Sequence, residues 1–73
     1  MENRSLLLTH DPVADVAYLY LRHPIGRGDI VRSEVADIET PPRTSIILSF
    51  DEYDRLITIE ILGASRLLPP ELL

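Results

Sequence analysis

Apolar side chains recur at every second position in the run 55–62, and this period limits what the chain can fold into. The residues that alternate are Ile57, Thr58, Ile59, Glu60 and Ile61. Because successive side chains of a β-strand point to opposite faces of a sheet, the run predicts a strand with one buried face. A helix would spread the three isoleucines around its axis, so the pattern argues against a helix here.

Four further runs are rich in the β-branched, aliphatic and aromatic residues that favour strands. They are the segments 5–10, 16–21, 29–39 and 44–50. The segment 16–21 is apolar on both faces, which is typical of a central strand. The segment 29–39 alternates less regularly, and we expect a β-bulge or a change of facing within it. The acidic segment Asp51–Asp54 predicts a solvated hairpin turn between the last two strands.

Proline and glycine mark the connections between these runs. The expected connections are a turn at Asp11-Pro12, one helical turn at Val13–Asp15, loops at His23–Gly28 and Thr40–Arg43, and a short helix at Gly63–Leu68 that Pro69-Pro70 ends. The chain is therefore predicted to be mainly β, or α+β with minimal helix. We expect a small antiparallel sheet or meander of about five short strands, followed by a C-terminal helical turn.

The length of the chain points to a partner. The 73 residues fit one small domain over residues 1–73. Hydrophobic residues make up 45% of the chain, yet a domain of this size buries only about 60% of the surface of its unfolded state. A second copy would cover more of the apolar surface, so we expect a homo-oligomer, in the form of a dimer.

Charge and residue content exclude several functions. The 12 acidic residues outnumber the 7 basic ones, which are all arginine and scattered, for a net charge of −5. Surfaces that bind nucleic acid are usually basic, so we expect no unaided nucleic-acid binding and favour a basic protein as partner. The lack of cysteine excludes disulfides and thiolate chemistry. No run fits a signal peptide or a membrane span, so we expect a cytoplasmic location away from membranes.

Two blocks of the sequence carry a family resemblance. Residues 11–19 (DPVADVAYL) resemble the D-P-x-A-D-x-x-Y-[IL] opening of domain of unknown function 2283, a family of small, mostly bacterial proteins. Residues 47–65 (ILSFDEYDRLITIEILGAS) resemble its closing pattern, I-L-D-x-D-x-x-G-R-[LI]-x-G-I-E-[IL]-L-x-A-S. Asp54 and Thr58 stand where the family usually has glycine. Aspartate tolerates the left-handed backbone of a hairpin tip, so we expect the hairpin to persist.

The resemblance implies a small, mainly antiparallel β domain, and it implies no chemistry because the family is uncharacterised. Its members resemble genomic companions of small toxin-like proteins. The resemblance therefore also implies an antitoxin-like partner of a basic toxin.

No catalytic constellation is found in the sequence, so we predict no enzyme activity, no catalytic residue, no metal and no cofactor. The leading hypothesis is a protein–protein interaction module that forms a homodimer. The alternative is a small-molecule or metal-binding protein with a site at an oligomer interface. Its candidate contact residues are His10, Asp11, Asp15, Tyr18 and Glu60.

Each candidate also has a plainer explanation. Imidazole and carboxylates within six residues suit a divalent ion, yet Asp11 and Asp15 are typical turn residues that bond the local backbone. Tyr18 and Tyr20 lie two positions apart, as in a ligand platform or as ordinary core residues. Glu60 interrupts an isoleucine-rich strand. We expect it to be exposed, to pair with Arg32 or Arg55, or to form a contact in an interface.

Overall fold

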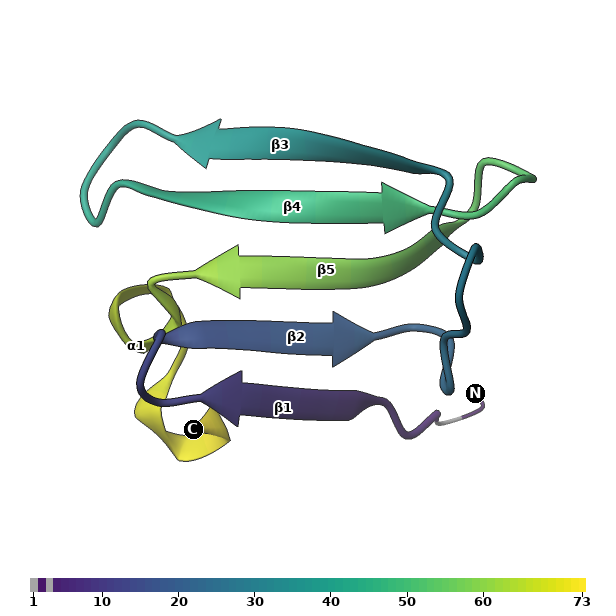
Figure 1. Ribbon diagram of the computed structural model, residues 1–73. Coiled ribbons are helices and arrows are strands. Elements are labelled where there is room, and N and C mark those ends of the chain that lie inside the picture. The colour runs from purple at the N-terminus through teal and green to yellow at the C-terminus, as the bar shows by residue number, and fades with distance from the viewer. Residues whose placement is uncertain (1, 3) are drawn as a thin grey trace.

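The computed structural model describes residue 2 and residues 4–73, which form one antiparallel β-sheet (Figure 1). Its strands are β1 (Leu7–Asp11), β2 (Val16–Tyr20), β3 (Arg32–Ile38), β4 (Thr44–Phe50) and β5 (Leu56–Leu62). Helix α1 (Ala64–Leu67) and a 3-10 turn (Pro70–Leu72) follow the last strand. The prediction of a mainly β, antiparallel fold with five strands and a short C-terminal helix is confirmed.

The spatial order of the strands is β1-β2-β5-β4-β3, so β5 lies at the centre of the sheet. Tight connections join β1 to β2, β3 to β4 and β4 to β5 (Figure 1). The connection 21–31 crosses from β2 to the far edge, where β3 begins, and β2 pairs with β5 instead of β3. The sheet therefore departs from a simple meander, and the predicted central strand, 16–21, is second from the edge.

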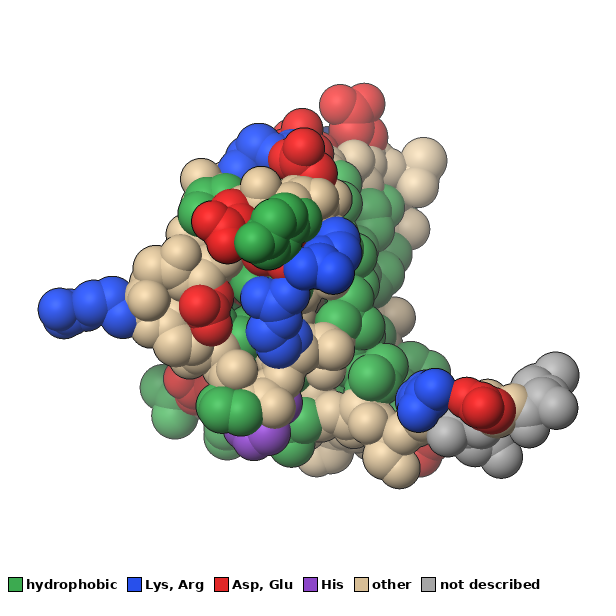
Figure 2. Space-filling model, turned by 90° about the vertical axis from the view of Figure 1, so that its right-hand side faces the viewer, with side chains coloured by type: hydrophobic (Ala, Val, Ile, Leu, Met, Phe, Trp, Pro, Cys, Tyr) green, Lys and Arg blue, Asp and Glu red, His purple; other side chains and the backbone are tan. Residues whose placement is uncertain are grey.

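One face of the sheet is apolar. Cross-strand pairing places Ile59 between Leu19 and Leu48 in the middle of this face. We give the name apolar face to the side chains of Leu8, Ala17, Leu19, Ile46, Leu48, Ile59 and Ile61. The same register places His10 of β1 and Arg32 and Glu34 of β3 on this side, at its margins. Helix α1 covers one end of it. Figure 2 shows hydrophobic side chains lining the hollowed, right-hand side of the molecule, where no second layer lies over the sheet.

The opposite face is acidic. We call acidic face the side chains of Leu7, Thr9, Asp11, Val16, Tyr18, Tyr20, Ser33, Val35, Asp37, Ser45, Ile47, Ser49, Thr58, Glu60 and Leu62. It has three carboxylates and no basic residue. The connection 21–31 covers one end of this face, where Thr58 and Ser49 are buried. The sheet thus presents two chemically different faces, each covered at one end.

The fully buried apolar core is small. Within the described part of the chain, the buried apolar side chains are Ala17, Ile57, Ile61 and Ala64. Ile57 is 2% exposed and is the largest side chain to be fully buried. Ala17, Ile61 and Ala64 form one cluster, where α1 meets the sheet. Most of the apolar face is only half-buried because, among the described residues, no second layer covers its middle.

The turns show one confirmed prediction and one error. Asp54 has a φ of 60° at the tip of the β4–β5 hairpin, so aspartate adopts the left-handed conformation there, as predicted. The helical turn predicted at Val13–Asp15 is wrong. The segment belongs to the β1–β2 turn, in which Asp11 Oδ1 accepts hydrogen bonds from the backbone N–H groups of Val13 at 2.9 Å and Ala14 at 3.2 Å. The local side-chain bonds favour this turn over a helix.

The β-bulge or change of facing expected within 29–39 is also wrong for the paired part of this segment, which shows neither. Strand β3 begins at Arg32 and pairs regularly with β4 as far as Ile38. The irregular register lies between Ser49 and Phe50, where β4 meets β5. The irregular alternation before Arg32 has another cause: residues 29–31 belong to the crossing connection.

Candidate functional site

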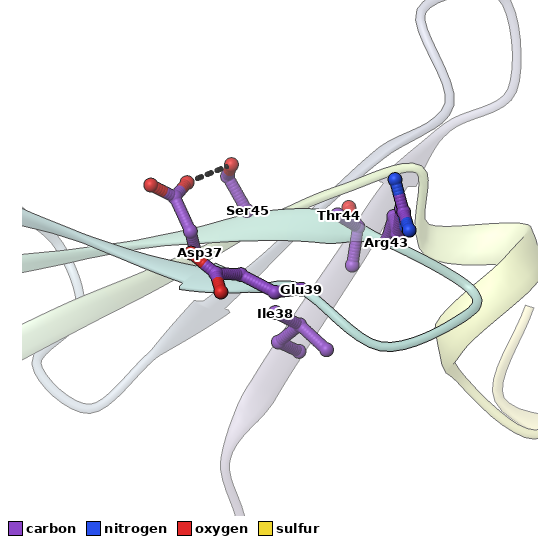
Figure 3. Close-up of a pocket in the computed structure, with 6 residues that line it drawn as sticks. All are labelled: Asp37, Ile38, Glu39, Arg43, Thr44 and Ser45. Carbon is purple, nitrogen blue, oxygen red and sulfur yellow. Dashed lines mark hydrogen bonds between the residues drawn. The ribbon is translucent and has the colours of Figure 1, made fainter.

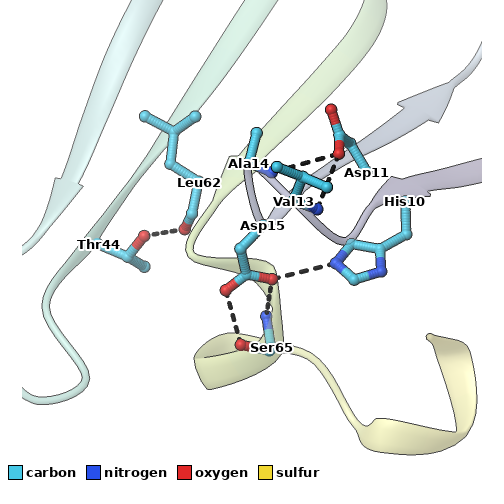
Figure 4. Close-up of polar contacts among 8 residues, drawn as sticks. All are labelled: His10, Asp11, Val13, Ala14, Asp15, Thr44, Leu62 and Ser65. Atoms are coloured by element: carbon cyan, nitrogen blue, oxygen red, sulfur yellow. Dashed lines mark hydrogen bonds and ion pairs between the residues drawn. The ribbon is translucent and has the colours of Figure 1, made fainter.

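Asp15 joins the β1–β2 turn to α1 (Figure 4). Its carboxylate accepts hydrogen bonds from the Ser65 hydroxyl at 2.6 Å and from the Ser65 backbone N–H at 3.0 Å. His10 Nε2 lies 3.0 Å from Asp15 Oδ1, and the backbone N–H of Ala64 donates to the Asp15 carbonyl at 3.0 Å. The Ser65 hydroxyl is the main cause that lowers the pKa of the Asp15 carboxyl, and the bond to His10 adds to it.

The order of these three side chains decides what they can do. In a nucleophilic triad the histidine lies between serine and carboxylate, where it takes the serine proton. Here Asp15 lies between Ser65 and His10, so the serine donates to a carboxylate of lowered pKa, which is a weak base. The arrangement holds α1 to the sheet. It also connects the two blocks that resemble the family, since Asp15 belongs to residues 11–19 and Ser65 to residues 47–65.

The predicted metal donors do not converge. His10 and Asp15 meet beside α1, whereas Asp11 turns to the backbone of its own turn. Over residues 2 and 4–73, no three His, Cys, Asp or Glu side chains are placed to hold a metal ion together.

Tyr18 and Glu60 form a second group, on the acidic face. They lie directly opposite each other on β2 and β5. The adjacent Glu60 carboxylate is the main cause that raises the pKa of the Tyr18 hydroxyl above its usual value. Tyr20 continues the row, with its ring centroid 6.3 Å from that of Tyr18 and an angle of 25° between the ring planes.

The two tyrosines and Glu60 line a hollow of about 320 Å³, which Ile25 and Ile30 of the connection 21–31 complete on another side. The five predicted contact residues are therefore divided. His10 and Asp15 lie at α1, Asp11 bonds its own turn, and Tyr18 and Glu60 belong to the hollow.

The sequence prediction missed the residues that close the hollow. Ile25 and Ile30 flank Gly26-Arg27-Gly28 in a segment that reads only as a flexible loop. A local bond orders this loop, because the backbone N–H of Gly26 donates to the Asp29 side chain at 2.7 Å. The sequence does contain one signal for these residues: two isoleucines near a pair of glycines, since large apolar residues in a loop usually pack on a neighbouring face.

The Asp51 side chain differs most from its sequence prediction. The hairpin turn was predicted to be solvated, yet Asp51 is 2% exposed. It accepts hydrogen bonds from the backbone N–H groups of Tyr53 at 2.9 Å and Arg55 at 3.0 Å, and from Arg22 at 2.5 Å. These contacts, led by the Arg55 backbone bond, lower the pKa of the carboxyl to about 2. Asp51 therefore fastens the hairpin to the start of the crossing connection.

A wider hollow of about 620 Å³ lies at the β3–β4 hairpin (Figure 3). Asp37 and Ser45 point to one side of the hairpin, where the serine hydroxyl donates to the carboxylate at 2.6 Å, and Ile38 points to the other. The polar groups along this hollow diverge, so they offer no common point of contact to a ligand. No helix in the described residues is long and apolar enough to cross a membrane.

The fold and its two faces define a class: a small single-sheet β domain whose side chains leave one face apolar and the other acidic. The family model for proteins of unknown function called DUF2283 matches residues 8–65. The chain belongs to this family. No curated protein and no solved structure matches the chain.

Proposed function

We propose that the protein is an interaction module that forms a homodimer through its apolar face. The accessible surface is 5477 Å², whereas a folded monomer of 8.3 kDa typically exposes about 4,600 Å². The excess of about 900 Å² is close to the area of about 800 Å² that each partner buries in a standard interface. The excess belongs to the surface as a whole. The half-buried middle of the apolar face, at Leu19, Leu48 and Ile59, is the observation that carries the proposal.

The nature of the apolar face supports a second copy as its occupant. Leu19, Ile59 and Leu48 form an apolar row across three adjacent strands, and the row ends at Glu34 on the edge strand β3. Face-to-face packing of two such sheets is a stable architecture, with side chains interdigitating across about 10 Å. Self-association also suits the net charge of −5, because apolar contact places the two acidic faces on opposite, outer sides of the dimer.

The acidic faces of this dimer would then be free for a basic partner. They carry three carboxylates without a basic residue, and opposite charge steers association. A basic toxin held in an antitoxin-like complex is the form of this function that we propose, in keeping with a small acidic protein.

The dimer is tested by size-exclusion chromatography with light scattering on the full chain. We expect a dimer for the wild type and a monomer for Leu48→Glu, because the change puts a charge in the middle of the apolar face. Val13→Glu is the matched control, since Val13 is 95% exposed at the β1–β2 turn and should leave the dimer intact. A circular dichroism spectrum shows whether Leu48→Glu keeps its sheet. A monomeric wild type, or a folded Leu48→Glu dimer, would contradict the proposal.

The partner is tested separately, by co-purification with the product of the neighbouring gene and by rescue of growth from that product. A complex and rescue are expected. Failure of both would remove the antitoxin-like role and would leave the dimer untouched, because the two functions use opposite faces.

A further inference from the structure

We infer that the hollow between Tyr18, Tyr20 and Glu60 binds a guanidinium group. This inference rests on the proposed binding of a basic partner to the acidic face, and it does not depend on the dimer. Glu60 supplies the charge, the two tyrosine rings supply a flat surface, and Ile25 and Ile30 supply the apolar wall.

The Glu60 carboxylate is partly removed from water, and no cationic side chain of the described residues lies beside it. It lies on the central strand β5, half-buried between Tyr18 of β2 and Ile47 of β4. A half-buried charge needs a partner to offset the loss of water. No arginine or histidine nitrogen of the described residues lies within 4 Å of it. Tyr18 lies directly opposite Glu60 on β2, and its hydroxyl is neutral, so it does not supply the missing positive charge.

The two arginines that the sequence offered to Glu60 are engaged elsewhere. Arg32 lies 3.1 Å from Glu34 and 3.5 Å from Asp54, at the edge strand and the hairpin tip. Arg55 lies 3.3 Å from Asp51. No cationic side chain of the described residues pairs with Glu60, so the hollow is open to a cation from another molecule.

The walls of the hollow favour guanidinium over other cations. A guanidinium is planar and weakly hydrated, stacks on aromatic rings and bonds a carboxylate with two parallel N–H groups. An ammonium keeps its water more strongly, and the isoleucine walls of the hollow offer no replacement for it. The volume of about 320 Å³ is at the lower end of the range for ligand pockets, which suits one such group and not a large ligand.

Two sources could supply this chemistry, an arginine side chain of a protein or a free guanidinium compound. The test is an NMR titration of the ¹⁵N-labelled full chain with two probes, the peptide Gly-Gly-Arg-Gly-Gly and methylguanidinium. A peptide with citrulline in place of arginine is the neutral control probe. We expect saturable shifts at residues 18, 20, 58 and 60 with the guanidinium probes and none with citrulline. The probe that binds more tightly identifies the source.

The variant Glu60→Gln keeps the shape of the side chain and removes its charge. We expect it to weaken binding of the guanidinium probes about tenfold or more, the size typical of a lost charge-assisted hydrogen bond. Glu52→Gln makes the same change of net charge at the exposed hairpin tip and should alter binding less than twofold. Tyr20→Leu, which keeps an apolar side chain, should also weaken binding.

The inference is overturned by any of three results: no saturable shift with either guanidinium probe, equal binding of the citrulline peptide, or equal loss of binding in Glu60→Gln and Glu52→Gln. None of these results bears on the dimer. Light scattering on the wild type therefore distinguishes a failure of this site from a failure of the apolar interface.

Discussion

Ile57 and Ile59 lie two positions apart on β5 and differ in what covers them. Ile57 is 2% exposed within one copy, whereas Ile59 is half-buried in the middle of the apolar face. Replacing a buried isoleucine by alanine costs about 2–5 kcal/mol, and a domain of this length has a total stability of about 4–11 kcal/mol. Ile57→Ala should therefore remove about a fifth or more of the stability whether or not the protein is a dimer.

The cost of Ile59→Ala depends on the dimer. If a second copy covers the apolar face, Ile59 is buried in the native state and its loss also costs about 2–5 kcal/mol per subunit. In a free monomer the same change removes a partly exposed side chain and costs about 1 kcal/mol. The ratio of the cost of Ile59→Ala to that of Ile57→Ala thus shows whether a second copy covers the apolar face.

Urea unfolding of the wild type and both variants measures these costs, at two protein concentrations that differ about a hundredfold. Unfolding of a dimer to separate chains makes its free energy fall by about 2.7 kcal/mol over that dilution. We expect this fall in the wild type, and a cost for Ile59→Ala close to that of Ile57→Ala. No change on dilution together with a cheap Ile59→Ala would refute the covered apolar face. A cheap Ile57→Ala would refute the description of the core itself.

Three further predictions concern the turns and α1. Because the pKa of Asp51 is lowered, its ionised carboxylate stabilises the fold above pH 3.8, and this stabilisation is lost as the pH falls toward about 2. The urea midpoint should therefore fall less steeply between pH 5 and pH 2 in Asp51→Asn than in the wild type. Equal slopes in the two proteins would contradict this. Asp54→Gly should stabilise the hairpin by about 0.5 kcal/mol, since glycine adopts the φ of 60° without strain, while Asp54→Ala should destabilise it in thermal melts. Ser65→Ala should speed hydrogen exchange at the amide of Leu68, which bonds the Ala64 carbonyl at 2.8 Å, because α1 loses one of its three hydrogen bonds to Asp15, the one from the Ser65 hydroxyl. Ser5→Ala, far from α1, is the control, and unchanged exchange in Ser65→Ala would contradict the role of this bond.

The strands were predictable from the sequence because their signal is local. Alternation along 55–62 predicts which of its side chains share a face, with Ile59 and Ile61 on one side and Thr58 and Glu60 on the other, and the register of the sheet agrees with it. The tip at Asp54 was predictable for the same reason, since a left-handed residue depends on its own chemistry.

The neighbours of each strand were not predictable from local pattern. Nothing in segment 16–21 indicates that it pairs with β5 after a crossing of eleven residues instead of with the next strand. The burial of Asp51 depends on this crossing, because it brings Arg22 to the β4–β5 hairpin from 29 positions away. A sequence of acids at a turn looks solvated until the fold supplies such a partner.

The same crossing determines the candidate site. It places Ile25 and Ile30 over the acidic face and turns the row of Tyr20, Tyr18 and Glu60 from an open surface into a walled hollow. The long connection 21–31 passes over the acidic face and therefore cannot also cover the middle of the apolar face. The proposed dimer would cover the apolar face with a second copy, and the proposed guanidinium site would pair the Glu60 carboxylate, which no cation of the described residues neutralises, with a cation from another molecule.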